Sequence, residues 1–317
     1  MEFIGNYAKT EEILKRHGFS IRKKYGQNFL IDRSVLLKIV ESAEIGEDDV
    51  VFEIGPGLGT LTQYLASRAG KVIAVEIDSH LIPILEETLA DFPNTEVIQA
   101  DILKFDIDTY LEENRKKEEE RSRTDDEADA GPDGNEKTVK KPRYKAVANL
   151  PYYITTPVLM KLLEGKTAFE TMLFMVQKEV AERLCASPGS KDYGALTLAA
   201  SYYTELKIVG TVPPSCFIPR PGVESALLLM KVRKEKPVGV LDEKLLFSLI
   251  RGSFNQRRKT LVNGISGFEG LSFTKDEVKQ AVRNAGLPES VRGEALTLSE
   301  FAAVADQLSL LSRQTEE

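Results

Sequence analysis

The residues best spaced for chemistry lie in a glycine-rich stretch that directly follows an apolar run at 50–54 and contains Gly55, Gly57 and Gly59. The apolar run predicts a buried parallel strand, and the glycines predict a tight turn into a helix. Because glycine has no Cβ, such a turn can approach a ligand closely. The pattern is typical of a nucleotide site at the strand ends of an open α/β sheet.

Two carboxylates stand at the ends of the next two predicted strands. Glu76 ends the run at 71–76, where a carboxylate can accept hydrogen bonds from both hydroxyls of a ribose. Asp101 ends the run at 96–101 and can accept from an adenine amino group. The alternative for Asp101 is an ordinary cap of the segment that follows.

The ligand is predicted to be S-adenosylmethionine (SAM) and not a nicotinamide dinucleotide. The dinucleotide fingerprint requires a glycine at the position of Thr60, where it admits a pyrophosphate to the helix N-terminus. Glu53, just before the turn, would repel a pyrophosphate but can help to orient a cationic methionine group through water. A glycine turn without a ligand is the alternative for this stretch alone.

A second stretch that can carry chemistry is Asn149-Leu150-Pro151-Tyr152, after the apolar run at 144–148. An adenine amino group is a poor nucleophile because its lone pair is delocalised into the ring. The Asn149 side-chain oxygen and the Leu150 carbonyl can accept from its hydrogens, since Pro151 cannot continue a strand ladder. Tyr152 can stack on the base. The alternative is a plain strand-ending turn.

Two further segments carry candidate ligand contacts. The segment at 23–30 sets polar amides between aromatic residues beside a basic run, which predicts a ligand-facing loop. The proline-rich loop at 212–221 presents Phe217, which we expect to form a second face against a flipped base. Packing of Phe217 in the core is the competing interpretation.

Composition excludes several classes of protein. The 317 residues suggest about two domains, and the 42% of hydrophobic residues suffice for a sizeable core. No apolar run approaches the roughly 18 residues of a membrane span, and the N-terminus lacks the features of a signal peptide. Cys185 and Cys216 lie far apart, and only two histidines occur. We therefore expect a cytoplasmic protein without a metal or a disulfide framework.

The net charge of −7 argues against a wholly basic nucleic-acid binder, but basic residues gather locally. We expect the RNA-binding residues to be Lys23, Lys24, Arg251, Arg257, Arg258 and Lys259. Simple solvated surface is the alternative for either group. The segment at 111–143 is rich in both charges and nearly free of apolar residues, which predicts a frayed helical extension followed by a disordered loop. An arm that contacts RNA or protein is its alternative.

The elements that must position these residues alternate between strand and helix patterns. Helices are predicted at 10–17 with Thr10 as cap, at 33–42 with Asp32 as cap, and at 58–68. The alternation predicts an α/β fold with a Rossmann-like sheet over residues 1–236. From this pattern together with the predicted SAM site, we expect a sheet of the class I SAM-dependent methyltransferase type. Helical patterns at 243–250, 257–262, 275–285 and 299–311 predict a small all-α C-terminal domain over 237–317.

These stretches together resemble the bacterial KsgA-type ribosomal RNA adenine dimethyltransferases. The resemblance covers nearly the whole chain and includes 23–30, the loop at 53–59, 149–152, 177–180, 213–219 and 253–261. The family tends to have Lys and Asp where this chain has Gly222 and Glu224. The first difference removes a possible phosphate contact, and the second keeps the charge.

The resemblance implies SAM-dependent dimethylation of two adjacent adenosines in the 3′-terminal hairpin loop of 16S rRNA, linked to small-subunit biogenesis. It implies a monomer whose partner is the small ribosomal subunit. The implied cofactor residues are Gln27, Asn28, Leu30, Gly55, Gly57, Glu76, Ile77, Asp101, Ile102 and Asn149. The implied catalytic residues are Asn149, Leu150, Tyr152 and Phe217, the two rings enclosing the adenine.

Two alternatives remain. One is a 23S rRNA adenine methyltransferase of the macrolide-resistance type, but those proteins look strongly basic and this chain has a pI near 5.3. The other is an RNA-binding ribosome-assembly factor with secondary or lost catalysis. The combination of the glycine turn, both strand-end carboxylates, Asn149 and Tyr152 argues that catalysis persists.

Overall fold

The structure is a computed structural model that describes residues 3–116, 142–165 and 169–315. Its contacts divide the chain into two units. The first contains Met1–Lys178 and Ile208–Val232, and the second contains Glu179–Lys207 and Arg233–Glu317. Residues 179–207 thus belong with the C-terminal helices, whereas we placed the boundary at 236/237.

The first unit is built on a seven-stranded sheet with the order β4-β3-β2-β5-β6-β9-β7. Its strands are β2 (Asp49–Ile54), β3 (Lys71–Glu76), β4 (Thr95–Gln99), β5 (Arg143–Asn149), β6 (Phe169–Gln177), β7 (Thr204–Val212) and β9 (Ser225–Val232). Strands β2 to β6 run parallel to one another, and β9 is antiparallel to β6. In register, Ile54 lies beside both Val75 and Ala148. The carboxyl ends of β3, β2 and β5 are therefore level.

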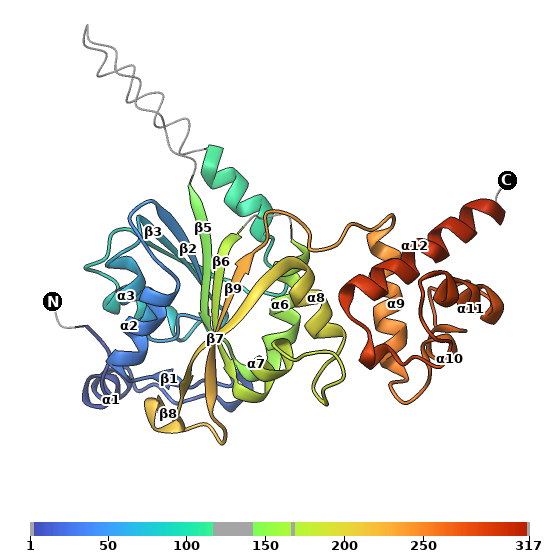
Figure 1. Cartoon of the computed structure of the whole chain (residues 1–317). Helices are drawn as coiled ribbons and strands as arrows, with labels where there is room; N and C mark the ends of the chain where they lie inside the picture. The colour runs from blue at the N-terminus through green and yellow to red at the C-terminus, as the bar shows by residue number, and fades with distance from the viewer. Residues whose placement is uncertain (1–2, 117–141, 166–168, 316–317) are drawn as a thin grey trace, which may run out of the picture. The chain divides into compact units, whose positions relative to one another are not determined.

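Helices cover both faces of this sheet, which explains why its central strands are mostly apolar and buried. Figure 1 shows α2 (Arg33–Ser42) and α3 (Thr60–Ala66) on one side and α6 (Thr155–Glu164) on the other. Val51 and Phe52 in β2 are fully buried. This arrangement confirms the predicted Rossmann-like α/β fold.

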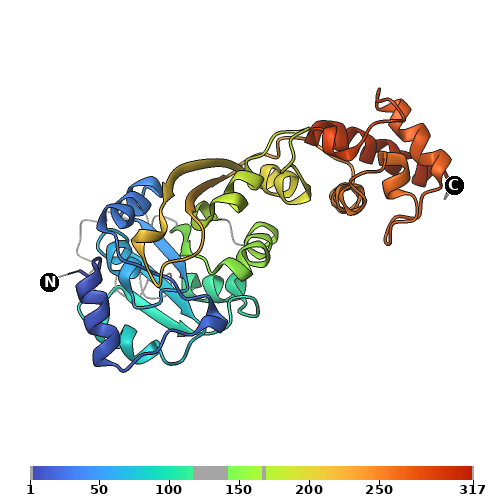
Figure 2. The ribbon, with the colours of Figure 1, turned by 90° about the horizontal axis from the view of Figure 1, so that it is seen from below.

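The N-terminal helix α1 (Tyr7–Arg16) begins three residues before the predicted start at Thr10. Asn6 is its cap, because the Asn6 side chain accepts from the Lys9 amide at 2.8 Å. Thr10 is instead buried inside the helix. Figure 2 shows α1, in dark blue, outside the sheet. His17 Nε2 lies 2.7 Å from Glu87 of α4 (Ile82–Thr88), which fastens the end of α1 to the unit.

Other boundaries follow local chemistry. Asp32 caps α2 as predicted, accepting from the Ser34 and Val35 amides. Helix α3 begins at Thr60, two residues later than predicted, because Gly59 has φ +81° and cannot continue a right-handed helix. A short antiparallel pair, β1 (Phe29–Leu30) and β8 (Phe217–Ile218), was not predicted.

The second unit has a hydrophobic core formed between its helices. The helices are α7 (Lys178–Leu184), α8 (Ala195–Tyr203), α9 (Glu243–Asn255), α10 (Leu261–Ile265), α11 (Lys275–Asn284) and α12 (Leu298–Thr315). The predicted helix at 257–262 was placed wrongly, because Thr260 caps α10 by accepting from the Asn263 amide. Arg257, Arg258 and Lys259 therefore lie before α10 and not within it.

The described residues contain no helix that is both long and apolar enough to cross a membrane. Residues 107–116 are helical, which confirms the helical extension predicted at the start of the charged segment. Most of that segment, residues 117–141, lies outside the described residues, so its role stays a prediction.

Candidate functional site

A pocket lies at the carboxyl ends of β2, β3 and β5, closed on one side by the N-terminal segment around η1 (Lys23–Tyr25). Every residue that we predicted for the cofactor lines it, as do Leu150 and Tyr152. The level strand ends of the sheet and the N-terminal segment together bring these residues to one place.

The glycine turn forms the floor of the pocket. Gly55 and Gly57 have φ +70° and +61°, a left-handed conformation that favours glycine. A Cβ on Gly55 would meet no atom within 4 Å, so it would project into the pocket space. A Cβ on Gly57 would come within 3.1 Å of the Phe29 ring. The turn therefore leaves a cradle that a side chain at Gly55 would fill.

Glu76, the last residue of β3, is 5% exposed. Its Oε1 accepts from the Asp78 amide at 2.8 Å, and its Oε2 accepts from the Gly57 amide at 3.2 Å. Burial raises the pKa of Glu76 to about 6, although these amides act in the opposite direction. At neutral pH the group is mostly ionised. Each oxygen retains a further lone pair, which suits the hydroxyls of a ribose.

Glu53 lies on the neighbouring strand and is 1% exposed. Burial raises its pKa to about 8; the Thr62 hydroxyl lowers this pKa and the charge of Glu76 raises it. Glu53 is therefore mostly neutral at pH 7. Within the described part of the chain its Oε2 has no hydrogen-bond partner. A buried polar atom of this kind in the wall of a pocket fits a site for a polar ligand.

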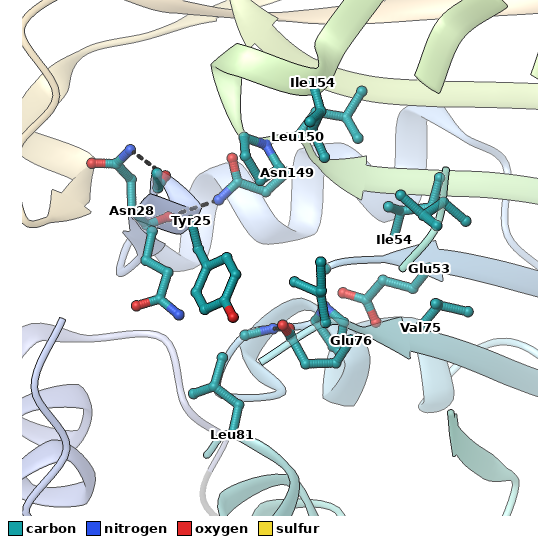
Figure 3. Close-up of a pocket in the computed structure, with 18 of the residues that line it drawn as sticks. Tyr25, Asn28, Glu53, Ile54, Val75, Glu76, Leu81, Asn149, Leu150 and Ile154 are labelled. Carbon is teal, nitrogen blue, oxygen red and sulfur yellow. Dashed lines mark hydrogen bonds between the residues drawn. The ribbon is translucent and has the colours of Figure 1, made fainter. Parts of the chain in front are cut away.

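The Asn149 side chain points toward the main chain of Asn28 at one side of the pocket (Figure 3). The Asn149 Nδ2 donates to the Asn28 carbonyl at 2.8 Å, and the Asn28 Nδ2 donates to the Gly26 carbonyl at 3.0 Å. With its nitrogen used in this way, Asn149 has its side-chain oxygen left as an acceptor. This orientation is the one that acceptance from an adenine amino group requires.

Tyr152 begins η2 (Tyr152–Ile154) and is half-buried. Its hydroxyl lies 2.8 Å from the Ser225 Oγ at the start of β9. Burial raises the pKa of Tyr152, and the Ser225 hydroxyl lowers it. The hydrogen bond between the two hydroxyl groups thus holds the Tyr152 ring in place at the pocket.

Phe217, which we expected beside the base, does not line this pocket. It is 2% exposed and belongs to the hydrophobic core. The reason is its place in β8, where it pairs with Leu30 of β1. Core packing, the competing interpretation, accounts for Phe217 in this structure.

Sequence reasoning missed two aromatic residues, Tyr25 and Tyr153, which also line the pocket. Tyr25 projects into it in Figure 3, and Tyr153 is 57% exposed. The signal was available only in part, since Tyr25 lies in the segment predicted to face a ligand. Asp101 lines the pocket, and its Oδ1 accepts from the Leu103 amide at 3.0 Å, so it caps the turn that follows, while its contact with an adenine amino group stays a prediction.

The predicted RNA-binding residues differ in their surroundings. Lys24, Arg251, Arg258 and Lys259 are exposed. Lys23 lies in η1. Arg257 is held within the second unit, because its Nε is 2.8 Å from the Glu294 carboxylate and its guanidinium donates to the Ser190 carbonyl at 3.0 Å. Arg257 therefore has a structural role that its place in a basic run does not reveal.

Comparison with known protein families adds a match over most of the chain. Residues 18–303 match the family described as "Ribosomal RNA adenine dimethylase". The chain is 49% identical to a protein of Lachnoclostridium phytofermentans named "Ribosomal RNA small subunit methyltransferase A", over 96% of this chain and 98% of that one. It is 45% identical to a protein of the same name from Streptococcus pneumoniae, with the same coverage.

Solved structures show the same fold. A dimethyladenosine transferase from Plasmodium falciparum is similar with a TM-score of 0.68 and 24% identity, over 91% of this chain and 98% of that one. The 23S rRNA methyltransferase ErmE is similar with a TM-score of 0.61 and 26% identity, over 89% of this chain and all of that one.

Proposed function

The chain belongs to the ribosomal RNA adenine dimethylase family, and we propose that it binds SAM in the strand-end pocket and methylates adenosines of the small subunit there. By its family it is an rRNA adenine dimethyltransferase, and its relatives are named rRNA small subunit methyltransferase A. The finer proposal is that its target is the pair of adjacent adenosines in the 3′-terminal hairpin loop of 16S rRNA.

The residues of the pocket fit SAM by their chemistry. Glu76, mostly ionised, would accept from the ribose hydroxyls, and Asp101 would accept from the adenine amino group of the cofactor. The turn at Gly55 would leave room for the methionine part. When bound, SAM supplies an electrophilic methyl group, and the protein's own task is to present the adenine to it.

The observation that carries this proposal is the orientation of Asn149. Because its nitrogen donates to Asn28, its oxygen can accept from the target amino group. The carbonyl of Leu150 would provide a second acceptor, and hydrogen bonds from both amino hydrogens favour a more tetrahedral nitrogen. Tyr152 would stack on the base and hold it in line. This positioning acts mainly in the transition state, where the nitrogen lone pair must leave the ring.

The test is methyl transfer from labelled SAM to small subunits that lack the modification, with the modified base mapped by mass spectrometry. Large subunits serve as the second substrate. We expect label in the small subunit only, as dimethyladenosine. Label confined to the large subunit would favour the 23S alternative. Binding without any transfer would favour an assembly factor without catalysis.

A further inference from the structure

Asp78 is a buried carboxylate in the turn after β3, two residues beyond Glu76. Its side chain is 1% exposed. Oδ2 accepts from the Gln27 Nε2 at 2.9 Å, and Oδ1 accepts from the His80 amide at 3.1 Å. Oδ1 also lies 3.2 Å from the His80 Nδ1 and 3.5 Å from a guanidinium nitrogen of Arg22. A buried charge with several partners on different segments indicates a defined structural task.

Both the nitrogen and the oxygen of the Gln27 side-chain amide form hydrogen bonds. Its Nε2 donates to Asp78, and its Oε1 accepts from the Arg22 amide at 2.9 Å. We predicted Gln27 as a cofactor contact, and it does line the pocket. Its side-chain amide, however, forms one hydrogen bond within the N-terminal segment, to Arg22, and one to Asp78 in the turn after β3.

The same segment is also fastened on the opposite side of the pocket. The carbonyl of Asn28 accepts from the side chain of Asn149, the last residue of β5. Asn28 directly follows Gln27, which donates to Asp78. The backbone amide of Asp78 in turn donates to Glu76. One short segment thus connects the strand end that carries Glu76 with the strand end that carries Asn149.

We propose that Asp78 is a positioning residue that fastens the segment 22–30 over the pocket and so pre-organises both Glu76 and Asn149. The inference rests on the proposed function, because it concerns how the same pocket holds SAM. Asp78 does not line the pocket itself. Removing its carboxylate would leave the Gln27 and Arg22 donors without an acceptor and free the segment. The segment would then have to be ordered when the cofactor binds, which weakens binding.

The test compares wild type with Asp78→Ala, Asp78→Asn and Gln27→Ala, with Asp91→Ala as control, since Asp91 is exposed and does not line the pocket. SAM affinity is measured by calorimetry, and amide hydrogen exchange is followed by mass spectrometry. Asp78→Ala is expected to weaken SAM binding by about tenfold or more. Exchange should become faster at 22–30 while β2 and β3 stay protected. Asp78→Asn, which keeps one acceptor oxygen, should recover part of the affinity.

A double variant distinguishes loss of the contact between Gln27 and Asp78 from a general loss of folded structure. If Gln27 and Asp78 act through one contact, Asp78→Ala combined with Gln27→Ala should weaken binding little more than Asp78→Ala alone. If Asp78→Ala does not fold, Gln27→Ala removes the same contact, and SAM affinity and exchange are measured on that variant. Wild-type affinity and unchanged exchange at 22–30 in both single variants would overturn the inference and leave the proposed function standing. A wild-type protein that does not bind SAM would overturn both.

Discussion

The side-chain nitrogen of Asn149 donates to the main-chain carbonyl of Asn28 over 2.8 Å, although 121 residues separate the two in sequence. This contact sets which atom of the Asn149 amide is left to meet a substrate. It also means that the N-terminal segment takes part in orienting the group expected to act on adenine. The expected cofactor and adenine sites are therefore parts of one hydrogen-bonded unit.

Asn149→Ala should lower turnover far more than it lowers affinity for the small subunit. The lost acceptor acts mainly in the transition state, and the loss of one such group typically costs on the order of a hundredfold in kcat. Single-turnover methylation and subunit binding measure the two effects. Asn94→Ala is a matched control, because the Asn94 amide also donates to main-chain carbonyls (Ala66 and Ala69) but does not line the pocket. Equal turnover in both variants would contradict the assigned role.

Glu76→Ala should weaken SAM binding by about tenfold or more, since buried hydroxyls would lose their acceptor at a cost of about 1–3 kcal/mol. Glu76→Gln is also expected to fail, because its amide NH₂ would face the Gly57 or Asp78 N–H group that now donates to the carboxylate. Calorimetry gives the affinity, and the melting transition shows whether each variant is folded. An unchanged affinity in a folded variant would refute the assignment.

Glu53 should make the protein less stable as pH rises. Its pKa is about 8 in the folded state, above the ordinary 4.5 of a glutamate, so the folded state binds more protons between these two values. Stability is then greatest below about pH 4.5 for this group and falls as pH rises toward about 8. Glu53→Gln removes the titration. Its melting temperature should match that of wild type near the acidic end of the window and exceed it near the basic end. A constant difference across the window would show that Glu53 does not titrate there.

Tyr152→Ala should lose a stacking surface worth about 1–3 kcal/mol for one base. Tyr152→Phe keeps the ring and should retain much of the activity. The structure adds a matched variant, Ser225→Ala, which removes the same 2.8 Å hydroxyl contact from the other side. The two conservative variants should show similar small losses. The ratio of mono- to dimethylated adenosine, measured by mass spectrometry, should change as the site loosens. A Tyr152→Phe variant as inactive as Tyr152→Ala would mean that the hydroxyl is essential.

Arg258 and Lys259 should contribute to rRNA binding through phosphates. Changing both to Glu should weaken subunit binding and flatten its dependence on salt, without altering SAM affinity. Arg257→Glu is the comparison, because it breaks the contact with Glu294 and should lower the melting temperature as well. A salt dependence equal to that of wild type in the Arg258 and Lys259 variant would identify these residues as solvated surface.

Local patterns predicted the strands and the pocket well, because their signals lie within short stretches. The glycine turn, Glu76 and Asn149 each end an apolar run, and parallel strands bring such ends to one edge. The cap at Asp32 was predicted for the same reason, since a cap and its helix are adjacent in sequence.

Contacts between distant segments could not be predicted in this way. The burial of Phe217 depends on pairing with β1, far earlier in the chain. The roles of Gln27 and Asp78 depend on a hydrogen bond between two residues that are 51 positions apart in sequence. Arg257 looked like its basic neighbours, and only the approach of Glu294 distinguishes it. Each of these cases is decided by tertiary packing and not by local propensity.

The division of the chain into units has a practical consequence for truncation. The helical unit is discontinuous, since residues 179–207 belong to it together with the residues after 233. Tyr202 packs against Phe247 with ring centroids 5.2 Å apart, and its hydroxyl donates to Glu243. A fragment that starts at 237 would expose this apolar surface to water and would aggregate more readily. To produce the helical unit alone, residues 179–207 must therefore be linked directly to the segment that begins at residue 233, without the intervening strands.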